Sequence, residues 1–338
     1  MQIHTDYPIK SLNTFHINAK ARYYTEISSE EDFLALKSEE AFLDSQKLFI
    51  GEGSNLLFSK DFEGILIKNS LKGISVVQEE NYSVVVEAAG GVRWDDLVAF
   101  CVENKFYGVE NLSGIPGTVG AAPVQNIGAY GVELKDLFHS LEGYFTDTMM
   151  KGFFEPEDCD FGYRYSVFKD RFKNSFLITK VRLTLSKVPV FKLNYRDLKE
   201  IFRNQPEESI VLADVRESVL GIRQNKLPDP LELGNAGSFF KNPEISNKKL
   251  KELREKYPDI VHFNVDANTV KVPAAWLIEK AGLKGYRLGN VATHSKQPLV
   301  IVNLGGASGE EIVRFSDFIR NKVSKKFQID LIPEVNII

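Results

Sequence analysis

The feature that most constrains this chain is a glycine-rich stretch at residues 111–131, with the sequence NLSGIPGTVGAAPVQNIGAYG. Five of its 21 residues are glycine and three are alanine. A core helix or strand does not use glycine this freely, because each one costs about 0.5–1 kcal/mol relative to alanine. Small residues do permit backbone N–H groups to approach a bulky anion such as a diphosphate. A long glycine-rich surface loop is the alternative interpretation.

A second small-residue turn, GEGSN at 51–55, follows the apolar residues 48–50. We therefore predict a strand that ends in a turn of available backbone N–H groups, and two such turns indicate a diphosphate held from two sides. The turn does not begin the Rossmann motif GxGxxG, because Leu56 stands where the third glycine belongs. The chain also lacks a P-loop pattern, so a diphosphate cofactor must bind outside both designs.

The composition is that of an ordinary soluble globular chain, with 338 residues, 43% hydrophobic and 26% charged. A net charge of −4 argues against nucleic-acid binding. No segment resembles a signal peptide and no apolar run is long enough to span a bilayer, so we expect a cytoplasmic protein that does not bind membranes. Cys101 and Cys159 lie outside any zinc or disulfide pattern, so we expect reduced thiols and no metal.

Apolar periodicity predicts the main elements. Strands are expected at residues 23–27, 47–50, 65–68, 72–78, 83–88, 137–146, 176–186 and 299–304. Helices are expected at 28–37, 94–102, 210–225 and 273–281, the last with Pro273 in its first position. Ser308 and Glu311 form a capping box that opens the last long helix. The break at 227–230, Leu-Pro-Asp-Pro, indicates a joint between domains.

Five separated segments carry a resemblance to a known family. GEGSN at 51–55, IPGTVGAAPVQNIGAYG at 115–131, FGYRYS at 161–166, GNAGSFFKNP at 234–243 and IPEV at 332–335 occur in the order seen in the UDP-N-acetylenolpyruvoylglucosamine reductase family. The chain resembles this family over essentially its whole length, and FKLNYRDL at 191–198 resembles the tyrosine-bearing segment of the family's longer form. Ala121 and Ala122 stand where relatives often carry glycine or serine, which are also small.

The resemblance implies a bacterial flavoenzyme that makes UDP-N-acetylmuramate for peptidoglycan, with FAD as cofactor and NADPH as co-substrate. It implies an α+β protein, with a two-lobed FAD-binding fold of the vanillyl-alcohol-oxidase type plus a separate α+β substrate-binding domain. We expect lobe one at residues 1–69 with 327–338, lobe two at 70–216 and the substrate-binding domain at 217–326. The residues expected to contact FAD are Gly51, Gly53, Ser54, Asn55, Ile115, Pro116, Gly117, Thr118, Gly120, Ala121 and Gly128.

Three residues match the family's catalytic positions. Hydride transfer from N5 of reduced FAD to the vinyl carbon of UDP-N-acetylglucosamine-enolpyruvate leaves negative charge that needs stabilisation. Arg164 suits this role, since a guanidinium binds a carboxylate through two bonds. Glu334 lies among apolar residues, and burial favours a protonated carboxyl that donates a hydrogen bond. Ser238 matches the proton donor. Without the resemblance, Arg164 would be interpreted as part of a surface ion pair, Glu334 as a carboxylate near the chain end and Ser238 as a turn residue.

Substrate contacts are expected from Tyr130, Tyr163, Tyr195, Arg223, Lys226, Asn242 and Gln297. NADPH is expected to use the same site before the substrate does, so that no second dinucleotide fold is required, and we expect a monomer. Two alternatives stay open. One is another FAD oxidase or dehydrogenase of the same fold acting on a small alcohol or sugar. The other is a non-catalytic flavin or UDP-sugar binding protein.

Overall fold

The computed structural model describes residues 1–338, apart from the side chain of Glu207. The chain forms two compact units, each described by itself below. Unit 1 contains residues 1–7, 21–52 and 63–225, and unit 2 contains residues 8–20, 53–62 and 226–338. The boundary at 225/226 falls beside the predicted break at 227–230, whereas the predicted division into two lobes and a substrate domain stays a prediction. Among the helices that the structure describes, none combines the length and the apolar character needed to cross a membrane.

The first sheet of unit 1 has four strands in the order β1-β2-β5-β3. Strands β3 and β5 run parallel, with Leu48 opposite Leu66. Helix α1 begins at the N-cap Ser29 with a capping box formed by Ser29 and Asp32, as the acidic first turn indicates. The bounds are β1 His4–Pro8, β2 Lys20–Ile27, α1 Glu30–Ala35, α2 Glu40–Leu43, β3 Lys47–Ile50 and β5 Phe62–Asn69.

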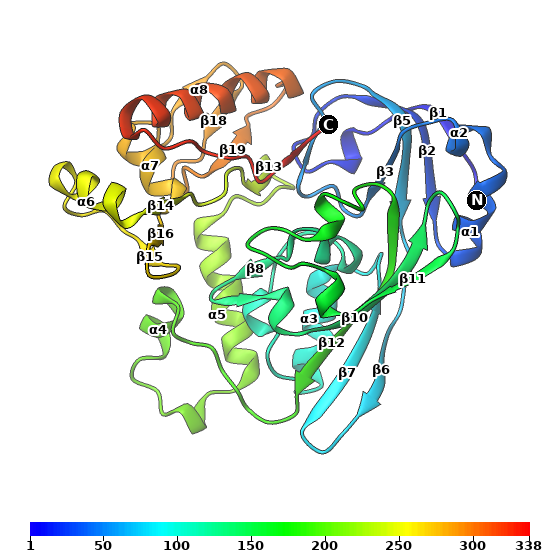
Figure 1. Cartoon of the computed structure of the whole chain (residues 1–338), viewed down its shortest axis with the longest axis horizontal. Helices are drawn as coiled ribbons and strands as arrows, with labels where there is room; N and C mark the ends of the chain where they lie inside the picture. The colour runs from blue at the N-terminus through cyan, green and yellow to red at the C-terminus, as the bar shows by residue number, and fades with distance from the viewer. The chain divides into compact units, whose positions relative to one another are not determined.

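The second sheet of unit 1 is an antiparallel ribbon of five strands, in the order β11-β10-β12-β7-β6 (Figure 1). Its longest strand, β12, pairs with β10 on one side and β7 on the other. The bounds are β6 Ile74–Glu79, β7 Ser83–Ala89, β10 Phe138–Phe145, β11 Lys151–Phe154 and β12 Phe176–Ser186. Three helices complete the unit, α3 Trp94–Glu103, α4 Arg196–Phe202 and α5 Leu212–Lys226, together with the short hairpin of β8 Gly128–Ala129 and β9 Val132–Glu133.

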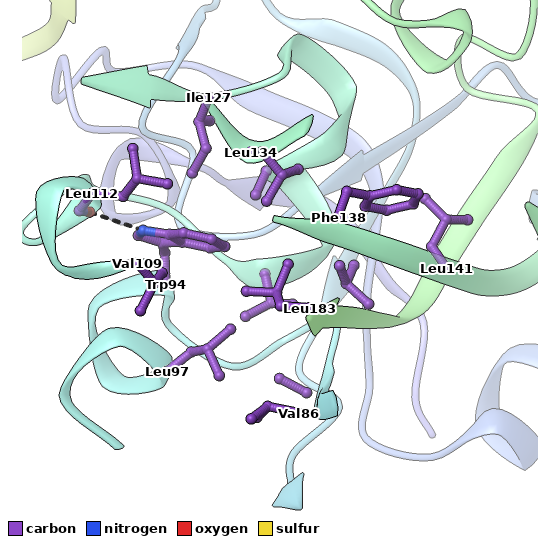
Figure 2. Packing of buried hydrophobic residues seen from close by; sticks show 14 of the residues in the cluster. Val86, Trp94, Leu97, Val109, Leu112, Ile127, Leu134, Phe138, Leu141 and Leu183 are labelled. Carbon is purple, nitrogen blue, oxygen red and sulfur yellow. Dashed lines mark hydrogen bonds between the residues drawn. The ribbon is translucent and has the colours of Figure 1, made fainter. Parts of the chain in front are cut away.

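Trp94 is at the centre of the core that supports the glycine-rich stretch. Figure 2 shows its indole ring among apolar side chains from this sheet, from α3, from the stretch itself and from the residues on either side of the stretch, including Leu97, Val109, Ile127, Leu134 and Phe138. The indole Nε1–H donates to the carbonyl of Leu112 at 2.9 Å, so the polar atom of this buried ring is paired. Cys101 is buried on the same face of α3, as its helical spacing predicts. The core therefore fixes both ends of the stretch.

Unit 2 contains a four-stranded sheet in the order β13-β19-β18-β17 and a three-stranded sheet in the order β14-β16-β15. Helix α8 packs on β18 and β19 (Figure 1). It begins at the predicted capping box, with Ser308 as N-cap and Glu311 as its reciprocal partner. The bounds are β13 Gly234–Ser238, β14 Glu244–Ser246, α6 Asn247–Lys256, β15 Phe263–Asn264, β16 Thr269–Lys271, α7 Ala274–Lys280, β17 Arg287–Leu288, β18 Val291–Thr293, β19 Val300–Asn303 and α8 Gly309–Phe327.

The C-terminal tail lies beside the turn that contains Asn55. Strand β20 Asn336–Ile337 pairs in parallel with β4 Leu56–Leu57. The backbone carbonyl of Ile338 accepts hydrogen bonds from both the N–H and the hydroxyl of Ser59, at 2.9 and 2.7 Å. The apolar tail thus completes unit 2 by pairing with a segment almost 280 residues earlier in the chain.

Most predicted elements are confirmed, with small corrections at their ends. The strands predicted at 47–50 and 176–186 have those bounds. The helix predicted at 28–37 is shorter, because α1 ends at Ala35 and continues as a 3-10 turn. The prediction for Pro273 is wrong by one position: it is the N-cap of α7, with extended backbone, and Ala274 is the first helical residue.

Candidate active site

Gly51 and Thr118, one from each glycine turn, meet within unit 1. A Cβ atom on Gly51 would lie 2.2 Å from the hydroxyl oxygen of Thr118, so only glycine permits this approach. Next to it, the carboxylate of Glu52 accepts a hydrogen bond from the backbone N–H of Gly117 at 2.9 Å and pairs with Nε of Arg93 at 2.9 Å. Glu52 and Arg93 were not among the residues singled out in the sequence. The two turns are therefore neighbours, as a site built from two sides requires.

The expectation of bare amides in the glycine-rich stretch is wrong at several positions. The N–H of Gly117 donates to Glu52, that of Gly120 to the carbonyl of Gly90 at 2.8 Å, and that of Ala121 to the carbonyl of Thr118. A Cβ on Gly120 would lie 3.0 Å from the backbone of Gly90. At these positions small residues serve the close packing of backbone against backbone, because the donors already have partners within the protein.

Arg164 lies at the tip of a tight hairpin. Gly162 and Tyr165 exchange both backbone hydrogen bonds, which leaves Tyr163 and Arg164 as the two loop residues. Arg164 has φ of 55°, a left-handed conformation that costs a non-glycine residue on the order of 1 kcal/mol. Its Nη2 donates to the carbonyl of Gly128 at 2.7 Å, and a Cβ on Gly128 would lie 3.0 Å from Nη1. Gly128 thus makes room for the guanidinium, which the sequence did not suggest.

Asp95 anchors the start of the glycine-rich stretch to α5. Its two carboxylate oxygens receive bonds from Arg216 at 2.7 and 2.8 Å, and Oδ1 also accepts from the N–H of Gly114 at 2.6 Å. Burial works to raise the pKa of Asp95, but the bonds from Arg216 and Gly114 outweigh it and lower that pKa. Arg223, two turns further along α5, donates from Nε to the carbonyl of Gly114 at 3.0 Å. Asp95 and Arg216 were not predicted from the sequence, because charged residues are common on helices and no local pattern indicates which of them form an ion pair.

Tyr130 and Tyr195, two of the predicted substrate residues, meet in unit 1. Their rings are in an edge-to-face contact with centroids 5.3 Å apart. Burial raises the pKa of Tyr130, and burial together with the nearby charge of Asp197 raises the pKa of Tyr195, so both phenols stay protonated donors at neutral pH. Burial lowers the pKa of Arg223 from its ordinary value, although the nearby Tyr130 works to raise it. Three predicted substrate residues therefore form one cluster.

Ser238 and Glu334 are brought together in unit 2. The N–H of Glu334 donates to the carbonyl of Phe239 at 2.8 Å, and Phe240 forms an antiparallel bridge with Pro333. Ser238 precedes Phe239 at the end of β13, opposite Val300 of β19. The side-chain amide of Asn55 donates to the carbonyl of Glu334 at 3.4 Å. The predicted serine, acid and one predicted cofactor residue thus lie on adjacent segments, more than 90 residues apart in sequence.

Two more predicted contacts occupy the same part of unit 2. Gln297 lies in the loop between β18 and β19, two residues before Leu299, whose carbonyl accepts from the N–H of Phe239. Asn242 follows β13, and its Oδ1 accepts from the N–H of Ala274 at 2.9 Å, which satisfies a donor at the start of α7. Asn242 therefore has a structural role in addition to any contact with a ligand.

The remaining predicted residues lie in turns or at a helix end. Lys226 is exposed and is the last residue of α5. Gly53 has φ of 64°, and a Cβ there would lie 2.1 Å from the carbonyl of Leu12. Ser54 and Ile115 are half-buried and Pro116 is exposed. Arg164 belongs to unit 1, whereas Ser238 and Glu334 belong to unit 2. The contacts of Arg164 are therefore given within unit 1, and those of Ser238 and Glu334 within unit 2.

Comparisons with known proteins agree on one family. Residues 23–147 match the FAD binding domain, and residues 229–338 match the C-terminal domain of UDP-N-acetylenolpyruvoylglucosamine reductase. The chain is 45% identical to the UDP-N-acetylenolpyruvoylglucosamine reductase of Amoebophilus asiaticus and 43% identical to that of Porphyromonas gingivalis, each over 100% of both chains. It also resembles the crystal structure of the reductase from Thermus caldophilus, with a TM-score of 0.66, 22% identity and coverage of 99% and 98% of the two chains. This last likeness supports the fold.

Proposed function

The chain belongs to the UDP-N-acetylenolpyruvoylglucosamine reductase family, and from this premise we propose how its residues reduce the enolpyruvyl ether of UDP-N-acetylglucosamine-enolpyruvate at the expense of NADPH. The protein is an FAD-dependent oxidoreductase of peptidoglycan precursor synthesis. The observation that carries the proposed mechanism is the juxtaposition of Ser238 with Glu334 on adjacent segments of unit 2. A proton donor and an acid on one rigid support can act on the same small group.

The residues present fit a flavin dinucleotide. The turns at 51–55 and 115–121 consist of small residues, and Gly51 and Thr118 bring them into contact. Gly237, directly before Ser238, has φ of 68°, and apart from its two chain neighbours no described residue has an atom within 4 Å of where its Cβ would be. We infer that these turns, with Asn55, hold the FAD, which supplies the hydride when bound and reduced.

Arg164, Ser238 and Glu334 carry the proposed chemistry of the substrate. The guanidinium of Arg164 binds the substrate carboxylate, where negative charge develops as the vinyl carbon is reduced. The carboxyl group of Glu334 donates a hydrogen bond that stabilises the same charge when it is protonated. The hydroxyl of Ser238 then gives its proton to the neighbouring carbon, and the hydroxyl is restored by a proton from solvent. All three residues are half-buried, which supports their assignment to an enclosed site.

The UDP group is proposed to bind through Tyr130, Tyr195 and Arg223 in unit 1. The edge-to-face contact of the two tyrosines and the bond from Arg223 to Gly114 support this assignment, since each holds a donor in place before the ligand arrives. Tyr163, Lys226, Asn242 and Gln297 are proposed as further contacts. We also infer that NADPH uses this site before the substrate does, and that the protein is a cytoplasmic monomer.

Steady-state turnover of three classes of substrate tests this proposal. We expect NADPH oxidation that depends on the enolpyruvyl substrate and no comparable oxidation of simple alcohols or sugars. The Ser238→Ala variant should bind FAD and have it reduced by NADPH as the wild type does, while product formation falls by a factor of about 10²–10⁴. Ser38→Ala, a surface serine in a 3-10 turn, is the matched control and should change neither. Near-normal product formation by Ser238→Ala would reject the role of this serine.

A further inference from the structure

Asn111, the first residue of the glycine-rich stretch, is completely buried. Its side-chain amide donates two hydrogen bonds, one to the carbonyl of Tyr130 at 2.9 Å and one to the carbonyl of Lys192 at 2.8 Å. The two acceptors are about 60 residues apart in sequence and belong to different segments. Because two carbonyls receive these bonds, the NH₂ end of the amide must face them. Asn111 is thus a buried bridge between the glycine-rich stretch and the segment that leads to Tyr195.

The bridge leaves the other end of the side chain without a partner. Among the side-chain atoms that the structure describes, Asn111 Oδ1 is one of two buried oxygen or nitrogen atoms that lack a hydrogen bond. A buried acceptor without a donor is costly, so an apolar residue would suit the core better if packing were the only requirement. What favours asparagine here is that one short side chain offers two donors in one direction.

The segment before Tyr195 has little else to define its backbone. Residues 189–194 form no helix or strand. Phe191 contacts Tyr107 edge-to-face with centroids 5.7 Å apart, and Phe191 and Leu193 pack on a cluster of buried apolar side chains from α4, α5 and Ile210. These apolar contacts bury area but do not select a single backbone position, whereas a hydrogen bond to the carbonyl of Lys192 does. Tyr195 follows three residues later as the N-cap of α4.

The other end of the bridge holds a strained residue. Tyr130 has φ of 49°, a left-handed conformation that a tyrosine rarely adopts without support. The bond from Asn111 to its carbonyl supplies part of that support. Asn111 therefore holds the backbone of Tyr130 directly and, three residues before Tyr195, the backbone of Lys192, and the rings of the two tyrosines meet at 5.3 Å.

We propose that Asn111 is a positioning residue for substrate binding, which sets the distance between Tyr130 and Tyr195 by holding the two backbones that carry them. This inference rests on the proposed function, in which both tyrosines contact the UDP group. Because Asn111 is completely buried, its role in this proposal is to act through the two tyrosines. Its loss should lower the affinity for the UDP ligand and raise KM, with a smaller effect on kcat and on FAD binding.

Two variants of Asn111 and one control test this proposal in the full-length holoenzyme. Asn111→Asp keeps the shape of the side chain but puts an acceptor oxygen where the amide has its two N–H donors. Asn111→Ala removes the amide altogether. Thr25→Val is the matched control, because Thr25 is also fully buried and its hydroxyl donates one bond, to the carbonyl of Gln2 at 3.0 Å. Hydrogen–deuterium exchange measures the protection of the backbone at residues 189–195. Titration with UDP-N-acetylmuramate measures the affinity of the substrate site, and flavin fluorescence measures the affinity for FAD.

We expect exchange in residues 189–195 to rise by about tenfold in both Asn111 variants, and the dissociation constant for UDP-N-acetylmuramate to rise by a similar factor, as the loss of two hydrogen bonds predicts. Exchange in β7 and the FAD dissociation constant should stay within about twofold of the wild type. Thr25→Val should leave all three readouts at wild-type values. Unchanged exchange at 189–195, or losses of FAD and UDP affinity of equal size, would overturn the proposal. A wild-type protein that binds no UDP compound would contradict the proposed function, and the exchange measurement would still decide the role of Asn111.

Discussion

Replacing Gly51 by alanine perturbs the one position where the two glycine turns touch. The added Cβ would lie 2.2 Å from Oγ1, 2.7 Å from Cγ2 and 2.9 Å from Cβ of Thr118. Ordinary contact begins near 3.4 Å, so the two turns must separate by about 1 Å. Rotation of the Thr118 side chain does not remove the clash, because its own Cβ is among the atoms that are too close.

The expected cost follows from this overlap. Overpacking of a well-packed site costs about 1–3 kcal/mol. Alanine offsets about 0.4–1 kcal/mol of this by restricting the unfolded chain. We therefore expect a net loss of about 1–2 kcal/mol in the free energy of unfolding, which a protein with about 5–15 kcal/mol survives. If the turns hold FAD from two sides, the separation should also raise its dissociation constant by about tenfold, equivalent to about 1.4 kcal/mol.

Urea unfolding followed by circular dichroism measures the stability, and quenching of flavin fluorescence on titration of the apoprotein measures the FAD affinity. Gly221→Ala is the matched control. Gly221 lies within α5, no described atom would lie within 4 Å of its Cβ, and alanine there should stabilise the helix by about 0.5–1 kcal/mol. A Gly51→Ala protein with wild-type stability and FAD affinity would refute the reasoning.

Three further predictions use other parts of the structure. Tyr195→Phe and Lys226→Ala should each weaken UDP-sugar binding by up to about tenfold in calorimetric titrations, and a selective loss of NADPH oxidation would count against the proposed map. Asp95→Asn should lower the free energy of unfolding by about 1–3 kcal/mol, because Arg216 loses its partner in a partly buried site, and an unchanged urea midpoint would contradict this. Burial works to raise the pKa of Glu142, but hydrogen bonds from Arg182, Lys151 and Lys180 lower this pKa from 4.5 to about 2. The ionised Glu142 therefore stabilises the folded state above pH 4.5, and this stabilisation is lost as the pH falls toward 2. Glu142→Gln should therefore flatten the acid-unfolding curve within that window, and an unaltered curve would exclude the effect.

Long apolar elements were predictable because local pattern and tertiary environment agree. Residues 176–186 begin with the apolar run at 176–178 and then alternate, with Val181, Leu183 and Leu185 buried, and this period of two is what a strand requires. The capping box of Ser308 and Glu311 lies within four residues, so the sequence alone contains all of its atoms. Helices α4 and α6 were not predicted. Each buries only two side chains, Leu198 and Phe202 in one and Leu250 and Leu253 in the other, which is too few to show a helical period.

The partners of the candidate site were much harder to predict than its members. The family resemblance points to Arg164, Ser238 and Glu334, and the structure then brings Ser238 beside Glu334. No local pattern tells that Glu52 accepts from Gly117, 65 residues away, or that Gly128 makes room for Arg164. These pairs are long-range, and the left-handed backbone of Tyr130 and Arg164 arises from tertiary contacts that residue type does not encode. The smallness of the glycines was visible in the sequence, but the atoms that they accommodate were not.

The central claim is that this chain holds FAD and uses it to pass a hydride from NADPH to an enolpyruvyl ether. The most direct measurement is flavin absorbance of the purified holoenzyme under anaerobic conditions, first on addition of NADPH and then on addition of UDP-N-acetylglucosamine-enolpyruvate. The account predicts that the visible absorbance of the oxidised flavin bleaches with NADPH and returns with the substrate, as one UDP-N-acetylmuramate forms per flavin. A folded protein that takes up no FAD, or a reduced flavin that the substrate does not reoxidise, would contradict it.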